Sequence, residues 1–201
     1  MKLASEEYYY WLSSSSRSAL HLTREAYDQA RHTWLCAGCV LPKPDVMKVD
    51  AMIGYMPENI PLNFVSGTGV GVARKDFLFS LGEDKVGRDL CFGRVFGPEG
   101  QLLDDWITFI GKHRIIVRGT KHVSARICEE CGRQIYFAMG RRYLYPRPPE
   151  GISIFDEGSS GLVVREALVG RVKLNQWRGL ACLKLPVLSA PRDGLGDLAD
   201  P

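Results

Sequence analysis

The first strongly periodic stretch of the chain predicts an amphipathic helix over residues 19–34. Leu22, Ala26, Ala30 and Trp34 recur at every fourth position, and charged residues occupy positions between them. This period places the apolar side chains on one face of an α-helix of about four turns. The helix leads directly into a pair of cysteines, so we expect its C-terminal end to position them.

Alternating and β-branched stretches in the middle of the chain predict short strands. Glycine- and proline-rich sequences separate them, as hairpin turns require, and a short helix is expected over 75–81. The glycine-rich segment 63–72 lacks the spacing of a nucleotide-binding loop and is interpreted as a turn into a strand. The strands between 90 and 118 are expected to follow one another as an antiparallel meander. The predicted strands are 8–12, 70–73, 90–96, 106–110, 114–118, 124–127 and 134–139.

After a proline-rich segment at 146–149, the pattern predicts a compact ββαβ module. Its elements in order are strands over 152–155 and 162–164, a helix over 165–177 and a strand over 180–185. We therefore expect a helix-and-sheet domain over 1–145 and the module over 146–201, packed on the same core. The tail from Ser189 is rich in Pro, Gly and Asp and is expected to be loose unless it docks.

Composition indicates an ordinary globular chain with a small positive charge. It has 201 residues, of which 45% are hydrophobic and 24% charged, and its formal net charge is +3. This charge is too small to argue for a nucleic-acid partner by itself. The apolar runs are too short to span a bilayer, and the first residues lack the apolar stretch of a signal peptide. We expect a protein of the reducing cytoplasm that has no membrane partner.

Two CxxC pairs carry the strongest chemical signal. Cys36 and Cys39 form the first pair, and Cys128 and Cys131, followed by Gly132, form the second. Two residues between cysteines let both sulfurs point to one side of a tight turn, here called a knuckle, and two knuckles supply the four thiolates of a tetrahedral Zn²⁺ site. The cofactor predicted is therefore Zn²⁺, joining parts of one fold that are about ninety residues apart in sequence.

Other interpretations of the cysteines are open at this point. Each pair is also compatible with a redox dithiol, and the six cysteines with a disulfide framework, although neither pair sits in a βαβ context and the chain is long enough to bury a core without crosslinks. His32 is a rival ligand on the predicted helix. Cys91 and Cys182 are expected to be free, buried thiols. The favoured fold class is α+β: an antiparallel β-rich centre with an N-terminal amphipathic helix, a two-knuckle zinc site and a C-terminal ββαβ module.

The second knuckle and the closing module together resemble the double-CXXCG-motif proteins, bacterial immunity proteins that protect a cell from a polymorphic toxin delivered between kin. The residues that carry the resemblance are CEECGR at 128–133, FDEGSSGLVVREAL at 155–168, WRGL at 177–180 and LPVL at 185–188. The resemblance implies a cytoplasmic, non-enzymatic protein that binds and neutralises a toxin domain. The chain departs from the motif at Val40, which follows Cys39 where the family has glycine, and this leaves the geometry of the first knuckle open.

Two other functions are compatible with the residues. A run of basic residues favours a nucleic-acid-binding zinc-ribbon protein, with Tyr136, Phe137 and Tyr143 available for stacking. A metalloenzyme would need His32, His113 or His122 in place of one thiolate, and no motif of hydrolase, nucleotide-binding or deaminase chemistry accompanies them. The basic residues are Lys112, His113, Arg114, Arg118, Lys121, His122, Arg126, Arg141 and Arg142.

For the immunity function, the expected partner-binding surface is acidic. Clustered carboxylates mimic the phosphates that a basic, nuclease-type toxin binds. The turns containing Asp104 and Asp105, and Asp156 and Glu157, are the candidates.

Overall fold

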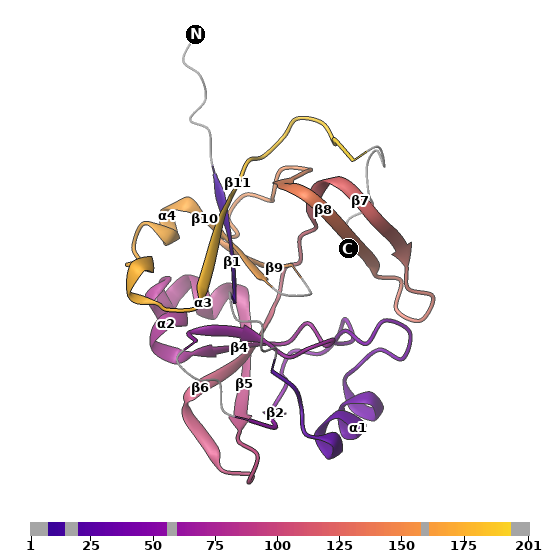
Figure 1. Ribbon diagram of the computed structural model, residues 1–201, viewed down its shortest axis with the longest axis vertical. Coiled ribbons are helices and arrows are strands. Elements are labelled where there is room, and N and C mark those ends of the chain that lie inside the picture. Colours follow the sequence, from indigo (N-terminus) through magenta and orange to yellow (C-terminus); the bar gives the residue numbers. More distant parts are fainter. Residues whose placement is uncertain (1–7, 15–19, 56–59, 158–160, 194–201) are drawn as a thin grey trace.

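The computed structural model describes residues 8–14, 20–55, 60–157 and 161–193. The fold is mixed α+β, with mostly strands and a few short helices (Figure 1). The elements in chain order are β1 (Tyr9–Ser14), α1 (Arg24–Thr33), β2 (Ala51–Met52), β3 (Leu62–Phe64), β4 (Gly71–Arg74), α2 (Lys75–Ser80), α3 (Glu83–Asp89), β5 (Leu90–Phe96), β6 (Leu102–Gly111), β7 (Val117–Ile127), β8 (Gln134–Leu144), β9 (Ile154–Asp156), β10 (Gly161–Arg165), α4 (Glu166–Val169), the 3₁₀ turn η1 (Leu174–Gln176) and β11 (Leu180–Leu185).

One sheet joins the two ends of the described chain. Its strand order is β11-β1-β10-β9, and all neighbours are antiparallel. The N-terminal strand β1 lies between two strands of the C-terminal segment, with Tyr9 opposite Arg165 on one side and Leu185 on the other. The C-terminal strands therefore share their sheet with the N-terminus.

A second sheet of five strands has the order β2-β5-β6-β4-β3. Strands β2 and β5 are parallel, and the other neighbours are antiparallel. The pairing of β5 with β6 shifts register between Arg94 and Phe96. This sheet forms the lower body in Figure 1, with α2 and α3 on one side and α1 on the other.

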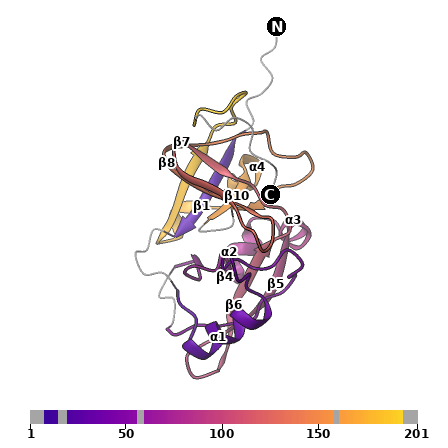
Figure 2. The ribbon, with the colours of Figure 1, turned by 90° about the vertical axis from the view of Figure 1, so that its right-hand side faces the viewer.

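Strands β7 and β8 form a separate two-stranded sheet, here called the ribbon (residues 117–144). The sequence predicted that β7 would continue the meander after β6, and this is wrong, because β7 pairs only with β8. The ribbon lies in front of the four-stranded sheet in Figure 2. Asp193 ties the root of the ribbon to a residue nearer its tip. The Nε and Nη2 atoms of Arg118, at the root, donate to the Asp193 carboxylate at 2.6 and 2.8 Å, and the hydroxyl of Tyr136, near the tip, donates to it at 2.8 Å.

Three apolar clusters hold these layers together. The largest lies where both sheets meet α2, α3 and α4, and it contains Leu12 of β1 and Phe109 of β6. A second covers the other side of the five-stranded sheet, and Trp34, just after α1, packs against it. The third, which includes Tyr9, joins the four-stranded sheet to the root of the ribbon. Leu12 and Tyr9 belong to different clusters, so β1 is buried on both faces.

The buried carboxylate of Asp89 connects the end of α3 to the start of β9. It accepts hydrogen bonds from the N–H groups of Ser153 (2.8 Å) and Ile154 (3.0 Å) and from Nη2 of Arg88 (2.8 Å). Burial by itself would raise the pKa of Asp89, but these donors outweigh it and hold the pKa below its ordinary value. The carboxylate is therefore charged in the folded protein at neutral pH.

The observed helices are shorter than the sequence predicted. Helix α1 begins at Arg24, where the Thr23 hydroxyl accepts a hydrogen bond from the Ala26 N–H at 3.2 Å. The helix predicted over 165–177 is reduced to α4, because the chain turns after Gly170 to bury Val172. In the described part of the chain, no helix is long and apolar enough to cross a membrane, and the longest, α1, has 10 residues.

Candidate metal centre

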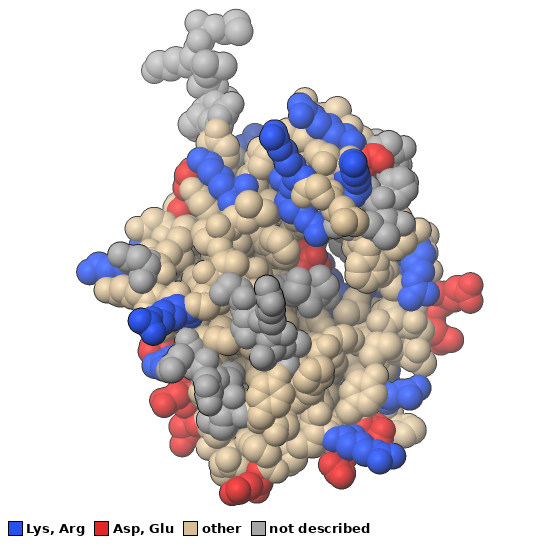
Figure 3. Space-filling model, in the orientation of Figure 1, with Lys and Arg blue, Asp and Glu red and all other residues tan. Residues whose placement is uncertain are grey.

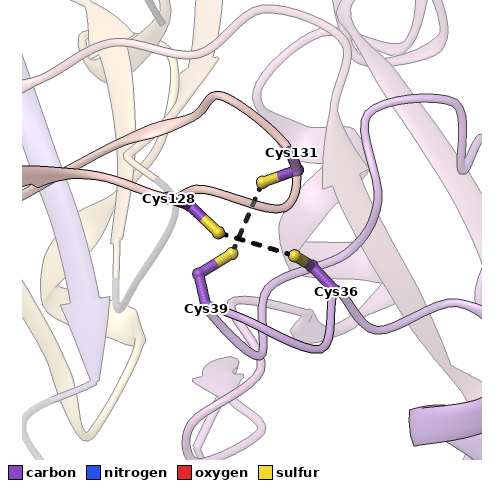
Figure 4. Close-up of side chains that lie close together, drawn as sticks. All are labelled: Cys36, Cys39, Cys128 and Cys131. Atoms are coloured by element: carbon purple, nitrogen blue, oxygen red, sulfur yellow. Dashed lines mark hydrogen bonds between the residues drawn. The ribbon is translucent and has the colours of Figure 1, made fainter.

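The two knuckles come from opposite parts of the fold and meet at one point. The first follows α1, whose end is fixed where the N–H of Leu35 donates to the carbonyl of Ala30 at 2.8 Å. The second is the connection between β7 and β8 at the tip of the ribbon. Figure 4 shows the four side chains pointing toward a common centre.

The sulfur positions fit a tetrahedral metal ion. The Sγ atoms of Cys36 and Cys128 are 3.7 Å apart, as are those of Cys39 and Cys131, and all four lie within 4.8 Å of one another. A tetrahedron with Zn–S bonds of about 2.3 Å has S···S edges of about 3.8 Å. The four thiol donors suit Zn²⁺, and the two 3.7 Å distances match the edge of such a tetrahedron.

The two knuckles share one backbone hydrogen-bond pattern. In the first, the Cys36 N–H donates to the carbonyl of Leu41 (2.9 Å) and the Val40 N–H to the carbonyl of Cys36 (2.9 Å). In the second, the Cys128 N–H donates to Arg133 (2.8 Å) and the Gly132 N–H to Cys128 (2.8 Å). The five-residue and four-residue offsets are the same in both, so the knuckles have equivalent geometry.

Backbone N–H groups also point at the sulfurs. Burial raises the pKa of Cys36, but the N–H groups of Cys39 and Gly38 and the neighbouring thiols outweigh this and lower it to about 7. Burial raises the pKa of Cys39 to about 12, although the N–H of Leu41 opposes it. Without metal, some of the four cysteines are therefore protonated thiols and others are charged thiolates. A metal ion that binds all four as thiolates displaces the protons.

Conformation after the second cysteine is left-handed in both knuckles. Gly132 has φ of 69°, and Val40 has φ of 62°, the only positive φ at a non-glycine residue among those the structure describes. A β-branched residue is strained there. The missing glycine after Cys39 is therefore accommodated by strain and does not change the geometry. Gly38 is needed for a different reason, because a Cβ atom there would lie 2.8 Å from the Cys128 Sγ.

Two largely buried arginine side chains, Arg114 and Arg133, lie beside the cluster. Burial lowers the pKa of Arg114, while the charges of Asp156, Cys39 and Cys131 raise it less strongly. Arg133 is 9% exposed, and its Nη1 atom has no hydrogen-bond partner among the described residues. A zinc ion with four thiolates carries a net charge of about −2, which these two cations offset.

The four cysteines predicted as ligands are thus brought together, and they form the metal-ligating group found among the described residues. His32 is exposed on α1 and lies outside this group, as does the exposed His113; the side chain of His122 lies outside the described part. The prediction that Cys182 is buried is wrong, because it is exposed on β11, and Cys91 is half-buried on β5. Both are free thiols.

The acidic surface predicted for partner binding does not form one patch. Asp156 is 1% exposed, since its carboxylate accepts from the Gly111 N–H (3.2 Å) and lies 4.0 Å from Arg114. Asp104 and Asp105 are exposed, but they lie in strand β6 and not in a turn. Along β6, Asp104 and Gly111 are about 23 Å apart at ~3.3 Å per residue. The half-buried Glu157 precedes residues 158–160 of the predicted loop, which lie outside the described residues.

The basic run of the sequence is also divided by the fold. Arg118 is fully buried against Asp193, and Arg114 is half-buried near the cysteines, whereas Lys121 and Arg126 are exposed on β7. Sequence reasoning missed the places of Arg114 and Arg133 beside the metal centre. One signal for Arg133 was present in the sequence, since it stands two residues after the last cysteine, where its N–H donates to the Cys131 sulfur.

Comparison of the chain with protein-family models, with curated proteins and with solved structures gives no match.

Proposed function

We propose that the four cysteines bind one Zn²⁺ in a closed structural site. The observation that carries this proposal is the set of four sulfurs at tetrahedral spacing, from two knuckles of equivalent geometry. Four thiolates complete the coordination of zinc and leave no position for water or substrate. The metal's chemistry is then confined to holding α1 and the ribbon together.

We propose further that the protein acts in the cytoplasm by binding another protein, as an immunity protein that neutralises a toxin domain. The support is the resemblance of CEECGR at 128–133 and of the closing segments to the double-CXXCG-motif proteins. A closed zinc site is compatible with this function, because it stabilises a surface without catalysing a reaction. A reducing compartment keeps such thiols free for metal.

Metal analysis and a matched pair of variants test the zinc site. We expect one Zn²⁺ per chain in the purified protein, and Cys128→Ser should lose the metal and several kcal/mol of stability, since the binding free energy of a structural zinc is folding free energy. Cys182→Ser removes an exposed thiol outside the cluster and should keep both. Substoichiometric zinc together with unchanged melting of Cys128→Ser would contradict the proposal.

Co-expression tests the immunity function. The wild-type chain should restore growth of cells that express the toxin encoded in the neighbouring reading frame, and the two proteins should form a complex. If the wild type neither protects nor forms a complex, the immunity function is wrong whatever the metal content.

A nucleic-acid partner is the second candidate, and one observation favours it. The ribbon exposes Lys121, Arg126 and Arg141 around Phe137, whose side chain is 57% exposed. Cations and an aromatic ring are what a single-stranded chain contacts. Binding of an oligonucleotide with a steep salt dependence would support this candidate.

A further inference from the structure

One face of the ribbon carries an exposed apolar stripe with basic neighbours. Along β8, Ile135, Phe137 and Met139 alternate onto one face, and Phe137 and Met139 are 57% and 62% exposed. Their cross-strand partners on β7 are Arg126 opposite Ile135, Ser124 opposite Phe137 and Lys121 opposite Met139. These three partners are exposed as well. Figure 3 shows Lys and Arg side chains gathered over this part of the surface.

The stripe continues into a hollow between the ribbon and the body of the protein. Its cavity, of about 420 Å³, is lined by apolar side chains from three places in the sequence and by the charged side chains of Arg114, Arg133 and Glu157. The surface is visibly hollowed below the ribbon in Figure 3. The apolar lining residues are Val40, Leu41, Ile115, Ile116, Ile135 and Phe137.

The four-cysteine centre fixes the walls of this hollow relative to each other. Cys39 and Val40, from the first knuckle, lie on its surface, and Ile135 and Phe137 lie on β8 just after the second knuckle. A metal ion that joins the two knuckles therefore holds the hollow open at a fixed width. Tyr136, which lies between Ile135 and Phe137 on β8, also lines this hollow, and its hydroxyl donates to Asp193.

The composition of the stripe favours a protein partner over a nucleic acid. Stacking platforms for single strands present successive aromatic rings, but Met139 and Ile135 have no ring and Tyr143 is buried. Phe, Met and Arg around an apolar centre, with a charged rim, are typical of protein interfaces. The basic rim made by Lys121, Arg126 and Arg141 calls for acidic groups around the partner's apolar anchor.

We infer that this stripe and hollow form the surface that docks the partner protein, which inserts an apolar side chain between Phe137 and the first knuckle and surrounds it with carboxylates. The inference rests on the proposed immunity function and replaces the acidic surface expected from the sequence. The partner's contact face is acidic with an apolar centre.

Binding of a purified, catalytically inactive form of the neighbouring toxin domain tests the surface. Phe137→Ala should weaken the affinity by about thirty-fold or more, as expected for a central anchor. Arg126→Glu should slow association, with the difference shrinking as salt is added. The matched controls are Leu102→Ala, which shortens an apolar side chain that is 48% exposed on β6, and Lys173→Glu, an exposed charge reversal away from the ribbon. Both should bind as the wild type does.

Each outcome distinguishes the surface from the function. Wild-type binding that Phe137→Ala and Arg126→Glu leave unchanged overturns the docking surface while the immunity function stands. Failure of the wild type to bind or to protect cells overturns both. Salt-dependent binding of a single-stranded oligonucleotide that Phe137→Ala abolishes, or self-association in sedimentation that it abolishes, assigns the stripe to another occupant and also overturns the inference.

Discussion

At the residue scale, Val40 and Gly132 show how two unequal sequences reach one geometry. Both follow the second cysteine of a CxxC pair, and both have φ close to 65°. Glycine adopts this conformation freely, whereas an L-residue with a side chain pays about 1–2 kcal/mol for it. The first knuckle keeps the conformation because the hydrogen bonds of Cys36 and Val40 fix its backbone.

This strain predicts opposite effects of two substitutions in the knuckles. Val40→Gly should stabilise the zinc-loaded protein by about 0.5–1 kcal/mol, because relief of the left-handed strain exceeds the added flexibility of glycine. Gly132→Ala should destabilise it by about 1 kcal/mol through backbone conformation alone, since nothing lies within 4 Å of the added Cβ. Urea unfolding at fixed zinc concentration measures both.

Gly87 in α3 supplies the control for backbone conformation. It also has open space around a Cβ, but its φ is not positive. Gly87→Ala should therefore stabilise the helix by about 0.5–1 kcal/mol. If Val40→Gly destabilises the protein by more than Gly132→Ala does, the left-handed conformation of Val40 has no free-energy cost.

The spacing of the cysteines was sufficient to predict the four-cysteine cluster, because CxxC constrains local geometry. The side-chain contacts made between distant elements were not predictable in the same way. Asp156 reads as an exposed acidic turn in sequence, yet the end of β6 and Arg114 bury it. Only the tertiary fold brings these groups together.

At the element scale, strands were predicted well where alternation is local and poorly where pairing is distant. The boundaries of β5 match the prediction. The pairing of β7 does not, since the chain between Gly111 and Val117 leaves the sheet to line the hollow with Ile115 and Ile116. Nothing in local periodicity distinguishes a strand that continues a meander from one that begins a separate ribbon.

Asp193, a single residue of the C-terminal segment, stabilises the attachment of the ribbon to the rest of the protein. Arg118 and Asp193 both have side chains with 0% exposure. Asp193→Asn leaves a buried guanidinium without its counter-charge and should cost about 3–5 kcal/mol in urea unfolding. The double variant Arg118→Met with Asp193→Leu removes both charges and should recover most of the loss.

A spectroscopic readout reports the same contact directly. Burial and the hydrogen bond to Asp193 raise the pKa of Tyr136 to about 12. In Asp193→Asn this pKa should fall, as measured by ultraviolet titration of tyrosine. An unchanged titration curve together with unchanged stability would show that the C-terminal segment does not clamp the ribbon in solution.

Asp89 predicts a pH-dependent contribution to stability where α3 meets β9. Because its folded-state pKa lies below the unfolded value, the contribution is fully present above about pH 4 to 5 and is lost as pH falls through the folded-state pKa. Asp89→Asn should cost about 2 kcal/mol at pH 7, since two N–H donors lose a charged acceptor. The difference in free energy of unfolding between Asp89→Asn and the wild type should disappear below about pH 4, when unfolding is measured across a range of pH.

The matched control for this prediction is Asp28→Asn, because Asp28 is exposed on α1, away from the contact between α3 and β9. Its stability should follow that of the wild type at every pH. If the difference in free energy of unfolding between Asp89→Asn and the wild type does not depend on pH, the packing of the Asp89 side chain causes the effect and its charge does not.

At the scale of the whole molecule, the metal centre joins two bodies that otherwise meet at few places. The ribbon is anchored by its root in the third apolar cluster, by Asp193 and by the second knuckle at its tip. Loss of the proposed zinc would free the tip alone. The sheets that contain the first and second apolar clusters do not depend on it.

Removal of zinc by a chelator should therefore loosen the protein unevenly. We expect faster amide hydrogen exchange in residues 119–142 and around Cys36, with little change in β4, β5 and β6, when exchange is followed by mass spectrometry. Binding to the partner should weaken in parallel, since the hollow loses its fixed width. A uniform acceleration across all strands would instead indicate that zinc supports the whole fold.

The position of β1 between β10 and β11 also dictates when the protein can finish folding during synthesis. The first strand leaves the ribosome long before β10 or β11 has been synthesised. Until then, both backbone edges of β1 have no strand to pair with, and Leu12 is not yet buried. The cysteines can meet as soon as residue 131 has emerged, and a metal ion can then hold the half-made chain compact. Only the arrival of residues 180–185 closes the sheet, and a nascent chain that stalls before them presents an open strand edge of the kind that seeds aggregation.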